Sequence, residues 1–150
     1  MKVKIKKTHK DAVIPSYSKV GDAGLDLTAT SRDWKYSDGG GYYEYGTGLS
    51  IEIPEGFVGL IFPRSSQSNV NQLLTNHVGV IDSNYRGEIK FRFKSVYQTV
   101  TELNEDFNIY KTGDRIGQLI IIPYPPIEFE EVDELSETIR GDKGFGSSGN

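Results

Sequence analysis

The chain has 150 residues, of which 36% are hydrophobic and 25% charged, with a net charge of −4 and no cysteine. Its length predicts one domain, residues 1–150, with a substantial core, and its acidic balance argues against a general nucleic-acid-binding surface. The absence of cysteine excludes disulfides, thiolate nucleophiles and cysteine-based zinc sites. No segment approaches the roughly 18 apolar residues of a membrane helix, so no membrane partner is expected.

The N-terminal segment alternates Val3 and Ile5 with lysines, which is typical of a strand with one solvent-exposed face. No apolar segment of a secretion signal follows these lysines, and nothing targets an organelle, so a cytoplasmic location is expected. Residues 38–48 hold five glycines and three tyrosines. We interpret this stretch as a surface loop with some strand character and assign it no function.

The middle of the chain contains several short apolar patterns broken by turns. Leu49–Ile53 alternates apolar and polar residues, Pro54-Glu55-Gly56 marks a turn, and Phe57–Phe62 predicts a more buried strand. Ser66–Asn76 is the best helical candidate, because Val70, Leu73 and Leu74 would share one face and Ser65 or Ser66 could cap its start.

The clearest period-two pattern covers Ile89–Lys94, where isoleucine and phenylalanines alternate with basic residues. Val80-Ile81 precedes it, with the turn-rich segment 82–87 between them, so the sequence predicts a hairpin. Gly117–Tyr124 is another predicted strand, which ends in prolines. With helical periodicity scarce, the sequence predicts an all-β fold, a barrel or sandwich with one short helix.

The C-terminal part differs in composition from the rest. Glu128–Thr138 carries six acidic residues and no basic one, which indicates a solvated arm over residues 128–139. Residues 140–150 hold four glycines and a single aromatic side chain, so we expect a flexible tail that is mobile when free.

Three segments could carry chemistry, and each also has a simpler structural explanation. Asp82 follows the apolar run Gly79–Ile81, so its carboxylate could be a general base or a metal ligand, or could merely cap its own turn. Arg64-Ser65-Ser66 offers a guanidinium, hydroxyls and amides to a phosphate, or is an ordinary helix start with a surface arginine. The tail could fold over a phosphate with Phe145 stacked on a flat ligand, or could remain disordered.

The order of the motifs is more specific than any one of them. Five segments occur in sequence: Asp-Ala-Gly-Leu-Asp-Leu at 22–27, Pro-Arg-Ser-Ser at 63–66, Gly-Val-Ile-Asp-Ser-Asn-Tyr-Arg-Gly-Glu-Ile at 79–89, Gly-Asp-Arg-Ile-Gly-Gln-Leu-Ile at 113–120 and Arg-Gly-Asp-Lys-Gly-Phe-Gly-Ser-Ser-Gly at 140–149. Together they closely resemble the five-motif signature of the trimeric dUTP pyrophosphatases (dUTPases). The chain departs from the usual family residues at Ser66, Asn84, Gly117 and Lys143.

The resemblance implies an enzyme that uses Mg²⁺ to hydrolyse dUTP to dUMP and pyrophosphate. It implies an all-β, jelly-roll-like subunit in a homotrimer, with active sites shared between subunits and residues 140–150 closing over the site as a lid. In metabolism, such an enzyme keeps uracil out of DNA and supplies dUMP for thymidylate synthesis.

The resemblance also implies roles for individual residues. Asp82 matches the general base that activates the water attacking the α-phosphorus, and Tyr85 matches the side chain that packs under the deoxyribose. Asp26 matches an acid near the water shell of the metal. The remaining matches contact the uracil edge or the phosphates, or belong to the closing tail: Asn76, Val80 and Lys90; Arg64, Ser65, Ser66 and Gln118; Arg140, Phe145, Gly146, Ser147 and Ser148.

Two other functions are compatible with parts of the pattern. The dCTP deaminases share this fold and have a similar Arg-Ser-Ser, but use a catalytic glutamate at the position that here is Arg92. A cation cannot serve as that acid or base. A non-catalytic nucleotide-binding protein that recruits a partner through residues 38–48 or the acidic arm is the second alternative, which an intact Asp82 and tail argue against.

Overall fold

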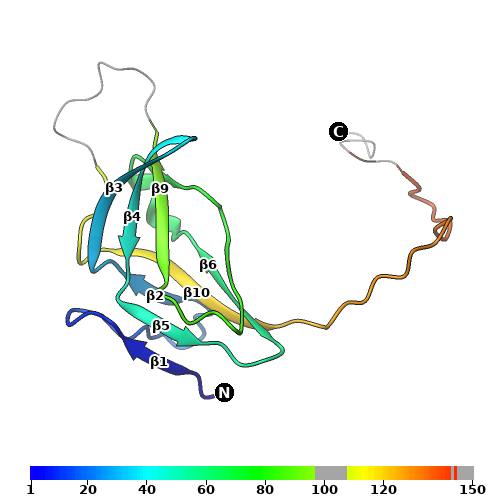
Figure 1. The fold of residues 1–150 in the computed structure, drawn as a ribbon, viewed down its shortest axis with the longest axis horizontal. Coiled ribbons are helices and arrows are strands. Elements are labelled where there is room, and N and C mark those ends of the chain that lie inside the picture. Colours follow the sequence, from blue (N-terminus) through cyan, green and yellow to red (C-terminus); the bar gives the residue numbers. More distant parts are fainter. Residues whose placement is uncertain (97–107, 143, 145–150) are drawn as a thin grey trace.

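The fold is built from two four-stranded sheets and a two-stranded sheet, with the C-terminal segment projecting away from them (Figure 1). The structure is a computed structural model that describes residues 1–96, 108–142 and 144. Its strands are β1 (Lys4–Lys7), β2 (Leu25–Thr28), β3 (Ser31–Ser37), β4 (Gly40–Gly46), β5 (Leu49–Glu52), β6 (Phe57–Phe62), β7 (Gln72–Leu74), β8 (Gly79–Ile81), β9 (Lys90–Ser95) and β10 (Arg115–Pro123).

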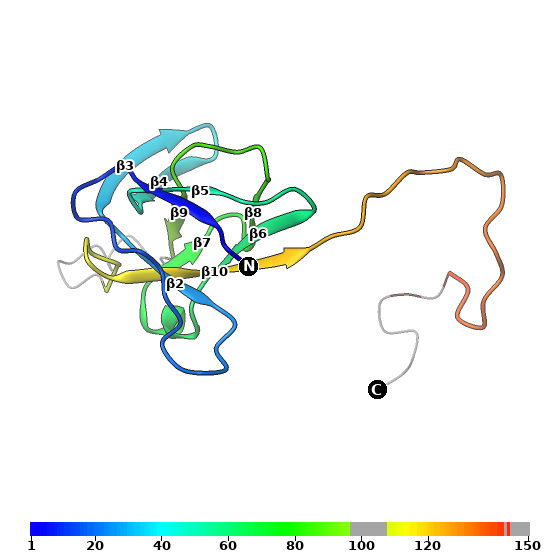
Figure 2. The same cartoon turned by 90° about the horizontal axis from the view of Figure 1, so that it is seen from below.

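The three sheets have the strand orders β2-β10-β6-β8, β3-β4-β9-β7 and β1-β5, and every pairing is antiparallel. Seen from below, the strands of the first two sheets lie around the middle of the fold, and the chain runs on from the end of β10 into the extended C-terminal arm (Figure 2). The prediction of an all-β, jelly-roll-like fold is confirmed.

The core lies between the sheets and shows why the clearest sequence pattern forms a strand. Phe91 and Phe93 on β9 are fully buried, whereas the basic residues that alternate with them, Lys90, Arg92 and Lys94, are exposed. The two phenylalanine rings are stacked, with centroids 6.1 Å apart. Burying each such side chain stabilises the fold by roughly 1.5–3 kcal/mol, so the alternation fixes which face of β9 points inward.

Residues 38–48 are not a surface loop, which corrects the sequence interpretation. Most of them form β4, paired with β3 on one side and β9 on the other. Tyr45 is fully buried, and its single hydroxyl proton is shared between two acceptors, Gln72 Oε1 (3.1 Å) and the carbonyl oxygen of Tyr110 (2.9 Å). Burial raises the pKa of Tyr45 to about 12. The glycines obscured a period-two pattern in which Tyr43 and Tyr45 share the inner face.

The predicted helix over Ser66–Asn76 is present only at its start, and its second half is wrong. A short 3₁₀ helix, η1 (Ser65–Asn69), is followed by strand β7. Arg64 stands at the N-cap with no side-chain capping bond, so neither serine caps the helix as expected. The strand forms because alternate residues Gln72 and Leu74 are buried against β9 while Leu73 between them is exposed.

The predicted hairpin between residues 80–81 and 89–94 does not form. Strand β8 pairs with β6 in one sheet, and β9 pairs with β4 and β7 in the other. Residues 82–89 therefore cross from one sheet to the other instead of turning back on themselves. This crossing determines where Asp82 and Tyr85 lie.

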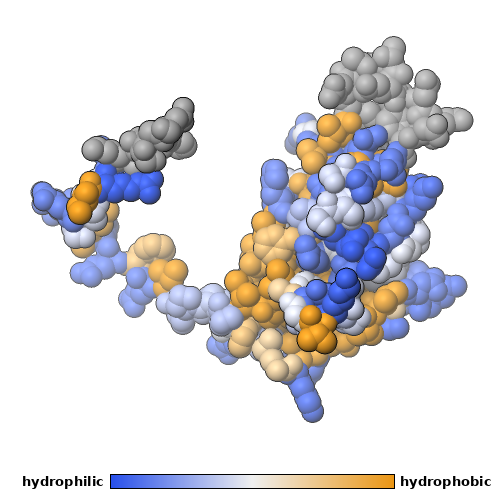
Figure 3. All heavy atoms as spheres, turned by 180° about the vertical axis from the view of Figure 1, so that it is seen from behind, coloured by the Kyte–Doolittle hydropathy of each residue, from blue (hydrophilic) through white to orange (hydrophobic). Residues whose placement is uncertain are grey.

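The segment after β10 lies apart from the sheets in an extended conformation (Figure 1). Its residues from Ile122 to Asp142 are all exposed. Apolar side chains alternate with the acids along it, including Phe129 at 92% exposed and Leu135 at 87% (Figure 3). Over the described ranges 1–96, 108–142 and 144, no helix has the length and apolar character needed to cross a membrane.

Candidate active site

A cluster of charged and amide side chains lies on the outer face of the sheet formed by β2, β10, β6 and β8. Asp26 on β2 and Gln118 on β10 are directly opposite each other in the strand register. Because Leu25 and Leu27 pack on the core, Asp26 between them points outward. We call Asp26, Arg64, Ser66, Arg115 and Gln118 the arginine cluster.

Asp26 bridges two guanidinium groups. Its Oδ1 accepts a hydrogen bond from Arg64 Nε, and its Oδ2 accepts one from Arg115 Nη1, each at 2.8 Å. The side chain of Asp26 is 19% exposed, so these are partly buried ion pairs. Both carboxylate oxygens of Asp26 are therefore engaged by arginines.

The remaining members of the cluster are held by local contacts. Arg64 Nη1 donates to Ser66 Oγ (3.1 Å), which gives the unusual serine at this position a role in orienting the arginine. Gln118 Nε2 donates to the carbonyl of Pro63 (3.0 Å), and its carboxamide lies where a Cβ on Gly24 would be. Ser65, Gln118, Asp26 and Arg64 line a pocket of about 350 Å³.

Arg115 was not recognised as a site residue from the sequence. It belongs to the motif at 113–120, from which only Gln118 was assigned a role. Arg115 and Arg64, with Ser66, also line an adjoining pocket of about 340 Å³. A basic residue three positions before Gln118 was a usable signal, but regular strand alternation would have placed it on the opposite face.

Asp82 and Tyr85 lie in a second group, on the crossing segment. The amide of Tyr85 donates to the carbonyl of Asp82 (3.1 Å), and the Tyr85 hydroxyl donates to the carbonyl of Glu88 (3.0 Å). The Tyr85 ring occupies the space that a Cβ on Gly87 would need. Both Asp82 and Tyr85 are exposed, and we call residues 82–88 the Asp82 loop.

The three predicted base-reading residues approach this loop from either side. The Asn76 amide lies beside Gly79, and Val80 on β8 is opposite Leu60 on β6. Lys90 begins β9, where the Thr75 amide already donates to the carbonyl of Arg92 (2.9 Å). Residues 72–75 therefore run beside β9, and the chain then passes through Asn76 to β8 in the other sheet.

The arginine cluster and Asp82 lie at opposite ends of β6. Ile81 is opposite Gly59, so Asp82 is level with Val58, and it shares a pocket of about 470 Å³ with Phe57 and Val58. Gln118 is opposite Phe62, and Arg64 lies two residues beyond. Arg64 lies six residues beyond Val58 along extended chain, which is about 20 Å. One chain does not bring the two groups together.

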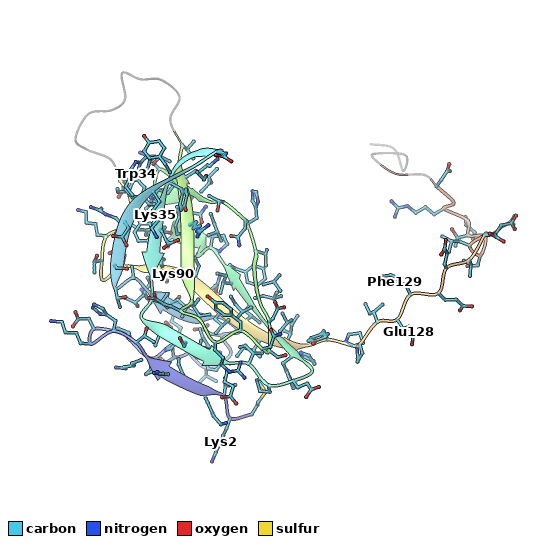
Figure 4. All side chains as sticks on the ribbon, in the orientation of Figure 1. Lys2, Trp34, Lys35, Lys90, Glu128 and Phe129 are labelled. Atoms are coloured by element: carbon cyan, nitrogen blue, oxygen red, sulfur yellow. The ribbon has the colours of Figure 1, made fainter. Side chains whose placement is uncertain are left out.

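Lys90 and Arg92 point to a buried carboxylate on the neighbouring strand. Glu44 accepts hydrogen bonds from Lys35 (2.7 Å), Lys90 (3.2 Å) and Arg92 (3.0 Å), and its side chain is only 4% exposed. Lys35 on β3 and Lys90 on β9 are labelled in Figure 4. Burial acts to raise the pKa of Glu44, but these three hydrogen bonds together lower it to about 2. Arg92 is thus occupied in an ion pair at the position where a deaminase would carry its acid.

The tail is only partly described. Arg140 is exposed and follows the acidic arm. The predicted contacts Phe145, Gly146, Ser147 and Ser148 lie outside the described residues, as does Lys143. Nothing in the structure explains Asn84, which lines the pocket next to Asp82.

Gly117 is explained by its neighbours. A Cβ at this position would overlap the ring of Phe91 and lie 2.9 Å from the carbonyl oxygen of Phe62. An alanine at this position would therefore need both neighbours to move.

Comparisons with known proteins agree on one family. A model of the dUTPase family matches residues 10–149. The chain is 44% identical to the deoxyuridine 5'-triphosphate nucleotidohydrolase of Helicobacter hepaticus, over 99% of this chain and 89% of that protein. It is 40% identical to the enzyme of the same name from Escherichia phage T5, over 98% of both chains.

The fold is shared with solved structures of the same family. A variant of the Staphylococcus bacteriophage 80alpha dUTPase bound to dUpNHpp superposes with a TM-score of 0.82 at 26% identity, over 99% of both chains. The match to the family extends over nearly the whole chain and includes all five motifs. The chain therefore belongs to the dUTPase family.

Proposed function

We propose a mechanism for this protein, which by family membership is an enzyme that hydrolyses dUTP. The products are dUMP and pyrophosphate, and the attacking water adds to the α-phosphorus. The observation that carries this proposal is the arginine cluster, because two guanidiniums on one carboxylate give a preformed site for a polyanion.

The triphosphate binds at the arginine cluster. Arg64 supplies a guanidinium that is already oriented by Asp26 and Ser66, and Ser65 lies in the same pocket. The Gln118 carboxamide packs against Gly24, and its Nε2 donates a hydrogen bond to the carbonyl of Pro63. These two contacts fix the carboxamide beside the pocket. Preorganised donors stabilise the charge that develops on the phosphates in the transition state.

Asp82 is the general base. Its exposed carboxylate removes a proton from the water as that water attacks the α-phosphorus, and the bond from that phosphorus to the bridging oxygen of the pyrophosphate breaks. Tyr85 packs under the deoxyribose and leaves no room for a 2′-hydroxyl. The Tyr85 ring is held in place by the hydrogen bond from its hydroxyl to the carbonyl of Glu88. It also packs against Gly87, where a Cβ would displace it.

Asn76 and the backbone at Val80 and Lys90 read the uracil edge. A site that donates to O4 and accepts from N3–H leaves unpaired polar groups against cytosine, and this costs far more than a lost methyl contact. The ion pair of Lys90 with Glu44 directs the Lys90 side chain toward β4, so its backbone rather than its ammonium serves the base.

Mg²⁺ is the proposed cofactor, bound to the triphosphate. Among residues 1–96, 108–142 and 144, no group of three or more histidine, cysteine or acidic side chains could form a cage. Mg²⁺ usually keeps several waters and takes one or two carboxylates together with substrate phosphates, so Asp26 fits a contact with its water shell. When bound, the ion polarises the phosphate oxygens.

The active enzyme is a homotrimer with shared sites. A general base must lie within about 3 Å of the proton it removes, directly or through one water. Asp82 and Arg64 of one chain are separated by the length of β6, so Asp82 of one copy must meet the arginine cluster of another. The exposed apolar side chains of the arm, such as Phe129, also favour contact with a further copy.

Residues 140–150 act as a lid on a single domain, with residues 128–139 as the arm that delivers them. Closure over the bound nucleotide excludes water other than the attacking molecule and brings Arg140 and Phe145 to the phosphate and base. In the cell, which we take to be the cytoplasm, the reaction keeps uracil out of DNA and supplies dUMP for thymidylate synthesis.

The test is pyrophosphate release from dUTP, dCTP, dTTP and UTP, each with Mg²⁺ and with a chelator. Mg²⁺-dependent release from dUTP alone is the expected result, since it reflects selection for both uracil and deoxyribose. Ammonia release from dCTP would replace this function with the deaminase. No reaction with any nucleotide in folded protein would favour a binding protein.

A further inference from the structure

Strand β10 contains an irregularity beside the arginine cluster. Gln118 is opposite Asp26 and Gly117 is opposite Leu27, but the next pair is Arg115 with Thr28, which leaves Ile116 as an extra residue. Such a β-bulge changes the direction in which neighbouring side chains point.

The bulge determines which face carries Arg115. Regular alternation would place Ile116 beside Gln118 on the outer face and Arg115 on the core face. Instead, Ile116 is fully buried, and Arg115 points outward to Asp26 with its side chain 52% exposed. The irregularity therefore brings a second guanidinium to the cluster.

The second guanidinium changes the charge that a ligand meets. Asp26 and Arg64 alone are neutral in sum, and Oδ2 of Asp26 would be left without its arginine partner beside a pocket for anions. With Arg115 the three groups carry a net charge of about +1, and both carboxylate oxygens are engaged. Because Arg115 holds Oδ2 of Asp26, Oδ1 stays in place to accept from Arg64 Nε. The Nη atoms of Arg64 then point toward Ser66 and the pocket.

We propose that Arg115 is a positioning residue of the dUTPase site, acting through Asp26 to aim Arg64 and to keep the cluster positive toward the triphosphate. The identity of the ligand rests on the proposed function. The geometric claim rests on the bulge and on the two 2.8 Å ion pairs.

The experiment measures binding of inorganic triphosphate to the full-length protein by calorimetry, with and without Mg²⁺. Arg115→Gln should raise the Kd about tenfold or more, as expected for loss of a charge-assisted hydrogen bond. Arg115→Lys keeps the charge without the planar fork, so its Kd should rise only about threefold. Lys111→Gln is the matched control, because Lys111 is an exposed cation in the preceding turn, and it should change the Kd less than about twofold.

A double-mutant cycle distinguishes action through Asp26 from a general loss of charge or fold. In an Asp26→Asn background the carboxylate charge is gone, so Arg115→Gln should now raise the Kd less than about threefold. An equal loss in both backgrounds would overturn the proposal, and so would an unchanged Kd in Arg115→Gln. A loss as large for lysine as for glutamine would overturn the role of net charge. Thermal unfolding of each variant verifies that folded protein is compared.

Pyrophosphate release by the unmodified protein separates this inference from the proposed function. If dUTP is hydrolysed but the cycle shows no coupling, Arg115 has no positioning role and the function stands. If the coupling is found but dUTP is not hydrolysed, the arrangement holds for another polyphosphate and the proposed function fails.

Discussion

The arginine cluster and the Asp82 loop are built in different ways. The cluster is held by side chains from β2, β10 and the segment after β6, which bond to one another in partly buried ion pairs. The loop is held by its own backbone turn and by the hydrogen bond from the Tyr85 hydroxyl to the carbonyl of Glu88. The side chains of Asp82 and Tyr85 are exposed.

The difference indicates how the reaction is divided. Side chains held in fixed ion pairs suit an anionic ligand that would otherwise be solvated by water. The cluster that provides them is complete within one chain. The exposed carboxylate of Asp82 is presented at the other end of β6, where a ligand on the same chain's cluster does not reach it. Variants on either side should therefore separate turnover from binding.

The largest expected effect is on turnover. Asp82→Asn removes the proposed general base and should lower kcat by about 10²- to 10⁴-fold while binding of a non-hydrolysable dUTP analogue changes little. Steady-state kinetics and calorimetry on one preparation would show this. Asp33→Asn, a change at an exposed acid on β3, is the control and should leave kcat intact. Loss of binding and turnover together would contradict the division.

The next effect concerns β10, the strand that carries Arg115 and Gln118 of the arginine cluster. Gly117→Ala should lower the free energy of unfolding by about 2–3 kcal/mol, because the added methyl group overlaps Phe91 and approaches Phe62. Urea denaturation gives the value. Gly113→Ala, also on the segment leading into β10 but strained only through its positive φ, is the comparison, and it should cost less. Equal losses would argue against close packing at Gly117.

A third prediction concerns the sheet beside the Asp82 loop. The pKa of Glu44 is lowered from 4.5 to about 2, so its stabilising contribution is present above about pH 4.5 and is lost as pH falls toward 2. Glu44→Gln should cost about 2 kcal/mol at pH 7, a figure reduced by the half-exposed cations. Unfolding measured from pH 7 to 3 should vary less for this variant, whereas Glu130→Gln in the exposed arm should behave as the unmodified protein does.

The smallest effect is on binding at the cluster. Gly24→Ala should displace the Gln118 carboxamide and raise the Kd for inorganic triphosphate about three- to tenfold, about 1 kcal/mol. Calorimetry measures it. Gly21→Ala has open space around its Cβ and serves as the control, although its positive φ makes a small loss of stability expected. A normal Kd in Gly24→Ala would mean that Gln118 is not positioned by Gly24.

Sequence reasoning predicted those parts of the fold that depend on simple alternation. The patterns at Phe57–Phe62 and Ile89–Lys94 correspond to β6 and β9, because burial of alternate residues fixes a strand locally. The same reasoning missed β4, whose glycines resembled a loop, and β7, whose three residues are too short for a periodic signal.

The site could be predicted only in pieces. The motif order placed Asp26, Arg64 and Gln118 in one family signature, and the structure brings them together. Arg115 could not be predicted, because its direction depends on a bulge created by pairing with β2 far along the chain. The distance from Asp82 to the cluster could not be predicted from the sequence either, because it depends on β8 pairing with β6 rather than with β9.

Subunit complementation tests the central claim most directly. Asp82→Asn and Arg64→Gln chains, each nearly inactive alone, would be co-expressed with different tags, and the mixed assemblies purified through both. If Asp82 of one copy serves the cluster of another, each purified mixed trimer should regain turnover at about one of its three sites, whichever variant is in excess. Mixed assemblies no more active than either variant alone would contradict the account, because both groups would then have to act within one chain.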